Sequence, residues 1–190
     1  GNQIYARFYN MTWWVPGGGT MKRGGTGGGT TKTGLVFEAK TDLSAAIQRV
    51  PGYSVTGNSV YKGSLEVGRL YAKNALYSDL LVPGGVNARS ILSKRLLPDD
   101  ALLALSDNVL HIIEKKFQRV NGSVDEKLQT CDFKLRQYRR LVKPLGLKVT
   151  YTYVLNDWFE DEAYRDVLEY IVDVGARYYF EIVPLDELGI

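Results

Sequence analysis

The sequence contains a single cysteine, Cys131, and a single histidine, His111, among its 190 residues. One cysteine cannot form a disulfide within the chain, and one cysteine with one histidine cannot complete a structural zinc site. Catalysis by a Ser-His-Asp or Cys-His arrangement is disfavoured as well, because His111 would have to be the sole imidazole base. Hydrolytic chemistry in this chain therefore has to come from carboxylates, lysines and a hard metal ion.

Long hydrophobic runs are also missing, since no apolar stretch reaches the roughly 20 residues that a membrane-spanning helix needs. The N-terminus lacks the basic and apolar segments of a secretory leader. We therefore expect a soluble, cytoplasmic protein with no membrane partner. The length of 190 residues and the hydrophobic content of 45% suit one buried core. The sequence predicts a single domain over residues 1–190.

The net charge of +3 is small, but it is unevenly distributed along the chain. Residues 115–148 contain ten Lys/Arg and three Asp/Glu, whereas residues 155–190 contain two and ten. A basic block can be an ordinary solvated face, but it also suits a phosphate backbone. Its meaning depends on whether it lies beside a catalytic motif.

A glycine-rich stretch occupies residues 17–34 and reads GGGTMKRGGTGGGTTKTG. It cannot bury apolar area, so we expect a loop. No Gly-Lys-Ser/Thr sequence follows the spacing of a nucleotide-binding P-loop. The loop is either a plain linker or a DNA-facing segment whose contacts are Lys22, Arg23 and Lys32.

Hydrophobic spacing and turn residues predict an α/β domain with a mixed sheet flanked by helices. Thr33 is a plausible N-cap for the first helix. The expected elements, in chain order, are a helix over 35–50, irregular strands and turns over 53–77, two largely buried hairpin strands over 101–105 and 109–113, an amphipathic helix over 124–143, a strand over 147–156, an acidic helix over 160–174 and a final strand over 177–183.

The predicted hairpin places chemically useful residues at its open end. Asp99 begins one strand, and Glu114 and Lys116 end the next. Antiparallel strands bring such ends side by side, and residues two apart on a strand share a face. Asp99 and Glu114 can thus converge on one ion with Lys116 beside them, while Lys115 points away. Oxygen ligands of this kind hold Mg²⁺, which phosphodiester hydrolysis uses to bind the phosphate and activate water.

Pro98-Asp99, the hairpin and Glu114-Lys115-Lys116 together resemble the PD-(D/E)XK signature of type II restriction endonucleases. The resemblance covers residues 30–183, with the catalytic hairpin at 96–118, and residues 122–127 are similar to a helix start in such enzymes. It implies the PD-(D/E)XK core fold, a Mg²⁺ cofactor and double-stranded DNA as substrate. The site residues that it implies are Asp99, Glu114, Lys116, Gln118 and, in the helix before the sheet, Glu38.

Several assignments stay open at this stage. Asp100 directly follows Asp99, and either can be the metal ligand; Asp99 is favoured because it completes the literal Pro-Asp pair. Asp79 is a third candidate at a longer spacing. The Glu114–Lys116 triplet can also be a solvated strand end, and His111 is most simply a core residue.

The preferred function is sequence-specific cleavage of double-stranded DNA by a homodimer, because one site cuts one strand. In this interpretation, Lys134 and Arg139 on the basic helix contact the phosphate backbone. One alternative is a nicking or repair nuclease, or a junction resolvase, on the same fold. Another is a DNA-binding module without catalytic activity.

Overall fold

The computed structural model describes residues 33–120 and 122–190, and Thr33–Ile190 form one compact unit. Most of the glycine-rich stretch, including Lys22, Arg23 and Lys32, lies outside the described residues. The strands are β1 (Gly34–Val36), β2 (Tyr53–Thr56), β3 (Ser59–Lys62), β4 (Leu65–Leu70), β5 (Asp100–Ala104), β6 (Val109–Lys116), β7 (Lys148–Leu155), β8 (Arg177–Phe180) and β9 (Ile182–Pro184). The α-helices are α1 (Leu43–Gln48), α2 (Ala88–Ile91), α3 (Val124–Leu128), α4 (Cys131–Val142) and α5 (Arg165–Asp173).

A seven-stranded mixed sheet forms the centre of this unit, in the order β2-β3-β4-β5-β6-β7-β8. The strands from β2 to β6 run antiparallel to their neighbours, while β6, β7 and β8 are parallel. Parallel neighbours need a crossover connection. Here α3 and α4 connect β6 to β7, and α5 connects β7 to β8. The expected α/β class with a mixed sheet is confirmed.

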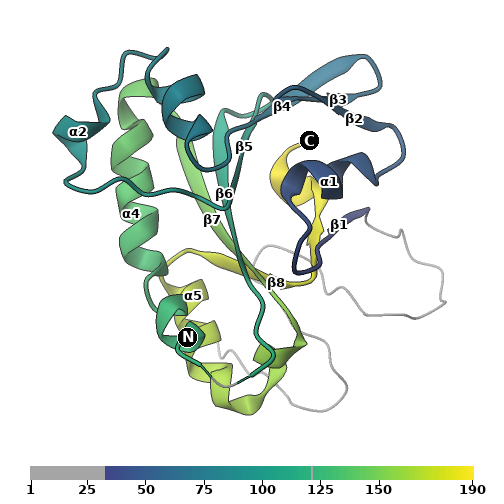
Figure 1. The fold of residues 1–190 in the computed structure, drawn as a ribbon, viewed down its shortest axis with the longest axis vertical. Coiled ribbons are helices and arrows are strands. Elements are labelled where there is room, and N and C mark those ends of the chain that lie inside the picture. Colours follow the sequence, from purple (N-terminus) through teal and green to yellow (C-terminus); the bar gives the residue numbers. More distant parts are fainter. Residues whose placement is uncertain (1–32, 121) are drawn as a thin grey trace, which may run out of the picture. The chain divides into compact units, whose positions relative to one another are not determined.

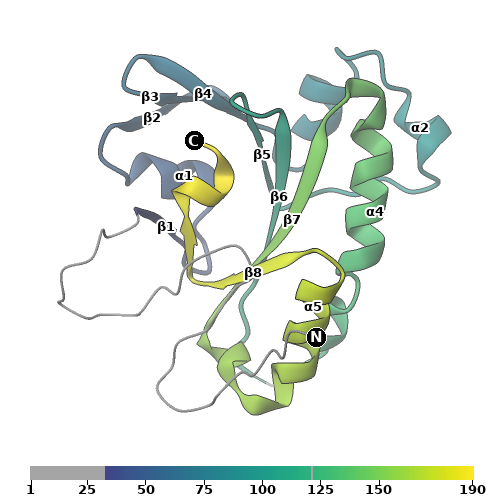
Figure 2. The same ribbon diagram turned by 180° about the vertical axis from the view of Figure 1, so that it is seen from behind.

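Both faces of the sheet are covered, as Figures 1 and 2 show from opposite sides. One face packs against α4 and α5, together with α2 and a helical segment at Leu76–Leu81. The other packs against α1, β1, β9 and the C-terminal end of the chain. A sheet that is covered on both faces needs apolar residues at successive positions, which explains the continuous burial of β5 and most of β6.

The predicted hairpin is confirmed in β5 and β6. Its turn depends on Asp107, whose side chain accepts a hydrogen bond from the Val109 backbone N–H over 3.2 Å. Asn108 follows with a positive φ of 57°, a conformation that asparagine tolerates better than most residues. The turn fixes the register, in which Asp100 pairs with Ile113 at the open end.

The predicted helix over 124–143 is present as α3 and α4, separated by a short turn. Its apolar stripe faces the sheet: Leu128, Cys131, Leu135, Tyr138 and Val142 are buried. The helix ends as expected, because Lys143–Leu145 tighten into a 3₁₀ turn that Gly146 closes with a φ of 68°.

The expected helix over 35–50 is only partly correct. Its first residues form β1, which pairs with β9, and α1 begins later, after Asp42. Asp42 is the actual N-cap in place of Thr33, and its side chain accepts from the Ala45 N–H at 2.8 Å. Pairing with a strand almost 150 residues away overrides the local helical spacing.

The expected final strand over 177–183 is divided in two. Glu181 adopts a positive φ of 56°, which turns the chain out of the seven-stranded sheet after β8. Its backbone then bridges the two sheets, donating to the Leu155 carbonyl at 2.9 Å and accepting from the Phe37 N–H at 2.7 Å. The segment after this bend is β9, the partner of β1 in the smaller sheet.

The remaining elements differ from the prediction mainly in their bounds. The strands over 53–77 form the antiparallel series β2 to β4, and the acidic helix starts later, as α5, after two 3₁₀ turns. The helical segment Leu76–Leu81 and α2 were not predicted. Within the described part of the chain, no helix is long and apolar enough to cross a membrane.

Candidate functional site

Asp99 and Glu114 stand side by side at the open end of the hairpin. The β5–β6 ladder pairs Asp100 with Ile113, so the next step along it sets Asp99 opposite Glu114. The Lys115 backbone N–H donates to Asp99 Oδ2 over 3.1 Å and holds this carboxylate against β6. Opposed residues in an antiparallel pair share one face of the sheet.

Lys116 connects the two carboxylates. Its Nζ lies 3.0 Å from Glu114 Oε2 and 3.9 Å from Asp99 Oδ2. Glu114 and Lys116 are two positions apart on β6 and therefore point to the same side, which is the side covered by α4. The structure thus brings together the three residues that the sequence placed at the hairpin end.

The Glu114 side chain is the most buried of the three, at 6% exposure, whereas the Asp99 side chain is 41% exposed. A buried carboxylate is costly unless cations or donors compensate for lost hydration. Two ammonium groups do so here, since Lys134 Nζ from α4 lies 3.6 Å from the same Glu114 oxygen that Lys116 contacts. The site therefore has a buried, charge-compensated end and a more open end at Asp99.

Three buried tyrosines, Tyr138, Tyr151 and Tyr153, pack beneath these charges. The Tyr151 ring lies 6.3 Å from that of Tyr138 and 5.3 Å from that of Tyr153. Burial raises the pKa of each hydroxyl above its usual value, and the negative charge of Glu114 raises it further. These phenols therefore remain neutral near pH 7.

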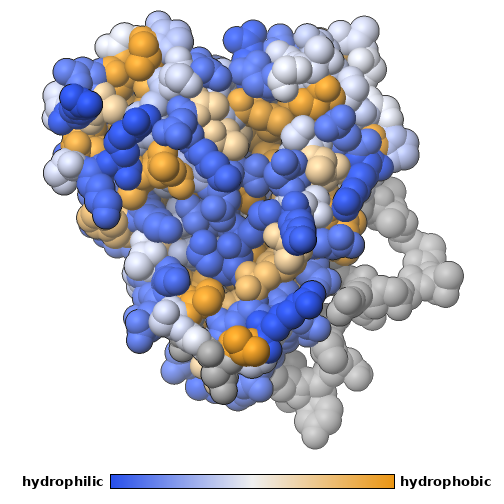
Figure 3. Space-filling model, in the orientation of Figure 1, coloured by the Kyte–Doolittle hydropathy of each residue, from blue (hydrophilic) through white to orange (hydrophobic). Residues whose placement is uncertain are grey.

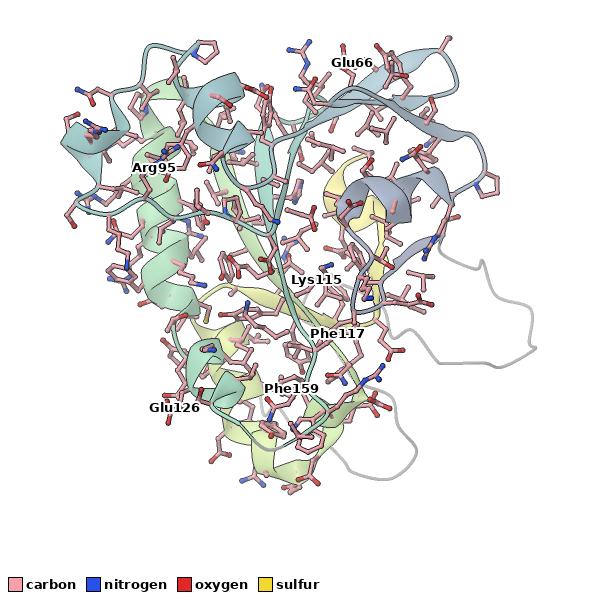
Figure 4. The ribbon with its side chains drawn as sticks, in the orientation of Figure 1. Glu66, Arg95, Lys115, Phe117, Glu126 and Phe159 are labelled. Atoms are coloured by element: carbon pink, nitrogen blue, oxygen red, sulfur yellow. The ribbon has the colours of Figure 1, made fainter. Side chains whose placement is uncertain are left out.

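Asp100 points to the opposite face of the sheet. It is 5% exposed, and burial raises its pKa to about 6, opposed by the Leu43 backbone N–H and the charge of Lys115. The Lys115 ammonium lies on this face too, where it donates to the Thr41 carbonyl just before α1. Figure 4 shows Lys115 on the α1 side of β6. Of the two adjacent aspartates, Asp99 is thus the one beside Glu114 and Lys116.

Gln118 is held through its backbone by Asn156, which follows β7. The Gln118 N–H donates to Asn156 Oδ1 at 3.0 Å, and the Gln118 carbonyl accepts from Asn156 Nδ2 at 2.7 Å. Its side chain is buried, with an oxygen that has no hydrogen-bond partner among the described residues. These contacts fix the backbone after the end of β6. Among the described residues, the Gln118 side chain makes no hydrogen bond to Asp99, Glu114 or Lys116.

Two other acidic candidates lie apart from this cluster. Glu38 occupies the exposed turn between β1 and α1, where its carbonyl accepts from the Thr41 N–H, so it is not in a helix as the sequence predicted. Asp79 is exposed on the Leu76–Leu81 segment and accepts from its neighbour Ser78 at 2.6 Å. Among the described residues, neither makes a hydrogen bond or ion pair with the Asp99–Glu114–Lys116 cluster.

His111 is a buried residue on β6, facing away from Glu114. Its Nδ1 lies 2.8 Å from Thr150 Oγ1 on β7. Burial lowers its pKa to about 4, so the ring is neutral near pH 7. This position agrees with the interpretation of His111 as a core residue.

The basic side chains of α4 point in two directions, toward the sheet or toward solvent. Lys134 turns toward the sheet and contacts Glu114, whereas Arg139 is exposed. Arg136 is also directed outward, at 72% side-chain exposure, and pairs with Asp132 at 2.9 Å. Figure 3 shows hydrophilic residues across the middle of this face, between α4 and α1.

A shallow pocket of about 280 Å³ near α2 was not anticipated from the sequence. Arg89 and Arg95 line it together with Ser93 and Tyr77, and the Arg95 guanidinium lies 3.9 Å from the centre of the Tyr77 ring. Figure 4 shows Arg95 on the α4 side of the sheet, opposite to Lys115. Arg89 and Arg95 lie outside the basic block at residues 115–148, and the sequence did not indicate that both line one pocket.

The chemistry of the cluster fits a hard divalent cation. Asp99 and Glu114 supply carboxylate oxygens that approach a common position, the one taken by Lys116 Nζ. The described residues contain no group of three or more His, Cys, Asp or Glu side chains suited to hold a metal. Mg²⁺ does not require such a group, because it commonly uses one or two carboxylates and completes its shell with water and phosphate oxygens.

Comparison of the chain with protein-family models, with curated proteins and with solved structures gives no match. The function is therefore inferred from the geometry of Asp99, Glu114 and Lys116 and from the charge around them.

Proposed function

We propose that this protein is a Mg²⁺-dependent DNA endonuclease with its reaction centre at Asp99, Glu114 and Lys116. The observation that carries the proposal is the convergence of Lys116 Nζ on both carboxylates, at 3.0 Å from Glu114 and 3.9 Å from Asp99. Two carboxylates that can bind a metal ion, with a lysine beside them at a partly exposed strand end, are the groups that metal-dependent phosphodiester hydrolysis requires.

The roles follow from position. Asp99 and Glu114 would hold Mg²⁺, which supplies a site for the phosphate oxygens and charge neutralisation. Lys116 would orient the attacking water or stabilise the phosphate charge. In the reaction, the water oxygen forms a bond to phosphorus and loses a proton, while the bond between phosphorus and one sugar oxygen breaks and that oxygen gains a proton. The lysine and the carboxylates position these groups.

Double-stranded DNA is the proposed substrate because the basic residues extend along α4 beside the carboxylates. Arg139 is exposed there, and Arg89 and Arg95 add positive charge near α2. A compact unit with one such centre cuts one strand, so cleavage of both strands requires two copies, which we propose act as a homodimer.

Cleavage of supercoiled plasmid with Mg²⁺ tests the proposal directly. Linear product indicates coordinated cutting of both strands, nicked circles indicate a single-strand nuclease, and unchanged plasmid contradicts nuclease activity. Glu114→Gln should abolish cleavage, and because the two side chains have similar volumes, the packing around position 114 should change little. Glu66→Gln is the matched control, because Glu66 is also a strand glutamate but pairs with Arg69 on β4, away from the cluster.

The homodimer is tested separately by sedimentation of the protein with a duplex that it cleaves. Two chains per duplex are expected. A complex of one chain per duplex that still produces double-strand breaks would contradict the dimer while leaving the nuclease assignment intact.

A further inference from the structure

Lys134 differs from the other basic residues of α4 in where its charge lies. Its side chain is 26% exposed and its Nζ lies 3.6 Å from Glu114 Oε2, whereas Arg136 at 72% exposure pairs with a neighbour on its own helix. A lysine on a helix surface can usually reach water with its ammonium group. Lys134 instead directs its charge inward, to a carboxylate on the sheet.

The helix itself does not favour a cation at this position. Lys134 is in the first turn of α4, where its N–H makes a helical hydrogen bond to the Thr130 carbonyl. The helix dipole disfavours positive charge at an N-terminus. An unfavourable helix position and partial burial both raise the cost of this charge. Among the described residues, the ion pair with Glu114 is the contact that offsets that cost.

Lys134 is the second ammonium group at one Glu114 oxygen. Lys116 lies closer to the same oxygen, at 3.0 Å. With Asp99 included, two carboxylates and two ammonium groups form a balanced set in one cluster. A metal ion bound by the carboxylates would weaken the ion pairs of Glu114 with Lys116 and Lys134. The two ammonium groups would then be available to a bound phosphate.

We infer that Lys134 is a second phosphate-binding cation of the reaction centre and not one of several backbone contacts along α4. This inference rests on the proposed function. Lys116 on β6 orients the water or binds the phosphate from the side of the sheet. Lys134 binds a non-bridging phosphate oxygen from the side of α4. In the absence of substrate, Glu114 holds Lys134 in place, so its ammonium is ordered before DNA arrives.

Lys134→Met and Arg165→Met form a matched test. Both remove one positive charge from a helix and keep a flexible apolar stem, but Arg165 at the start of α5 pairs with Glu162 and Asp166 and makes no contact with Glu114 among the described residues. In single-turnover cleavage of plasmid at saturating Mg²⁺, Lys134→Met should be about a hundredfold slower than the parent, and Arg165→Met should remain within a few-fold. Lys134→Arg should recover part of the loss.

Binding of Mg²⁺ alone, measured by calorimetry without DNA, supplies a readout that lost packing would not produce. Lys134→Met should bind Mg²⁺ several-fold more tightly than the parent, because a cation beside Glu114 is gone, and Mg²⁺ binding by Arg165→Met should be unchanged. If the parent cleaves plasmid but the two variants cleave and bind Mg²⁺ alike, the inference is wrong and the proposed function stands. If the parent cleaves no DNA, both fail.

Discussion

The Lys115 backbone N–H donates to Asp99 Oδ2 over 3.1 Å, while the Lys115 ammonium donates to the Thr41 carbonyl on the other face of the sheet. One residue thus links both faces at the end of β6. Its backbone positions a carboxylate of the proposed reaction centre, and its side chain attaches the sheet to the start of α1. This explains why Lys116, and not Lys115, is the lysine beside Glu114.

Asp99→Asn should lower both Mg²⁺ affinity and cleavage, with a rate loss of about a hundredfold to ten-thousandfold. Asparagine keeps an oxygen that can accept from the Lys115 N–H but loses the ligand charge. Calorimetry with Mg²⁺ and plasmid cleavage measure the two effects. Asp79→Asn is the control, since Asp79 is an exposed carboxylate bonded to Ser78. If Asp100→Asn abolishes cleavage and Asp99→Asn does not, the metal ligand is Asp100 and the assignment of Asp99 is wrong.

Lys116→Met should abolish cleavage without weakening Mg²⁺ binding, because it removes a cation that lies 3.0 Å from Glu114. Lys115→Met is the neighbouring control. It should reduce stability, since the Thr41 carbonyl loses its donor, but the folded fraction should cleave at a rate within a few-fold of the parent. Cleavage by Lys116→Met at the parental rate would remove the main support for the nuclease proposal.

Asp100 should make stability depend on pH. Burial raises its pKa from 3.8 to about 6, so the folded state holds the proton more tightly than the unfolded state. Its contribution is therefore fully present below about pH 4 and is lost as pH rises through 6, by about 1–3 kcal/mol. Asp100→Asn removes this dependence. Urea unfolding across this range should show the variant gaining stability relative to the parent as pH rises, and His111, present in both proteins, cancels from the difference.

A constant difference in unfolding free energy between the parent and Asp100→Asn would show that this carboxyl titrates normally. It would then have to be more hydrated than its 5% exposure indicates.

The exposed arginines should act through the phosphate backbone. Arg139→Ala and Arg95→Ala should each weaken DNA binding to a similar extent on all sequences and reduce the slope of log K against log salt by about one unit. Fluorescence anisotropy with a duplex at several salt concentrations measures the slope. Arg165→Ala is the control, because Arg165 at the start of α5 pairs with Glu162 and Asp166. An unchanged slope for Arg95→Ala would exclude the pocket near α2 from the DNA-binding surface.

The hairpin and its register could be read from the sequence because the signals are local. Buried strands on either side of Asp107 and Asn108 define the turn, and the turn determines which residues meet at the open end. Alternation along β6 then separates Lys115 from Lys116. The apolar stripe of α4 was equally readable, because each turn of the helix repeats the pattern that the sheet requires.

The α/β class, the hairpin, the basic helix and the proximity of Asp99, Glu114 and Lys116 were therefore predictable from local patterns in the sequence. Pairing in the folded chain was needed to show that Leu35 and Val36, which helical spacing placed at the start of a helix, belong to β1 and pair with Val183 and Ile182. The tertiary fold also brings Lys134 to Glu114 from another element. These outcomes depend on contacts between segments far apart in the chain, which local spacing does not encode.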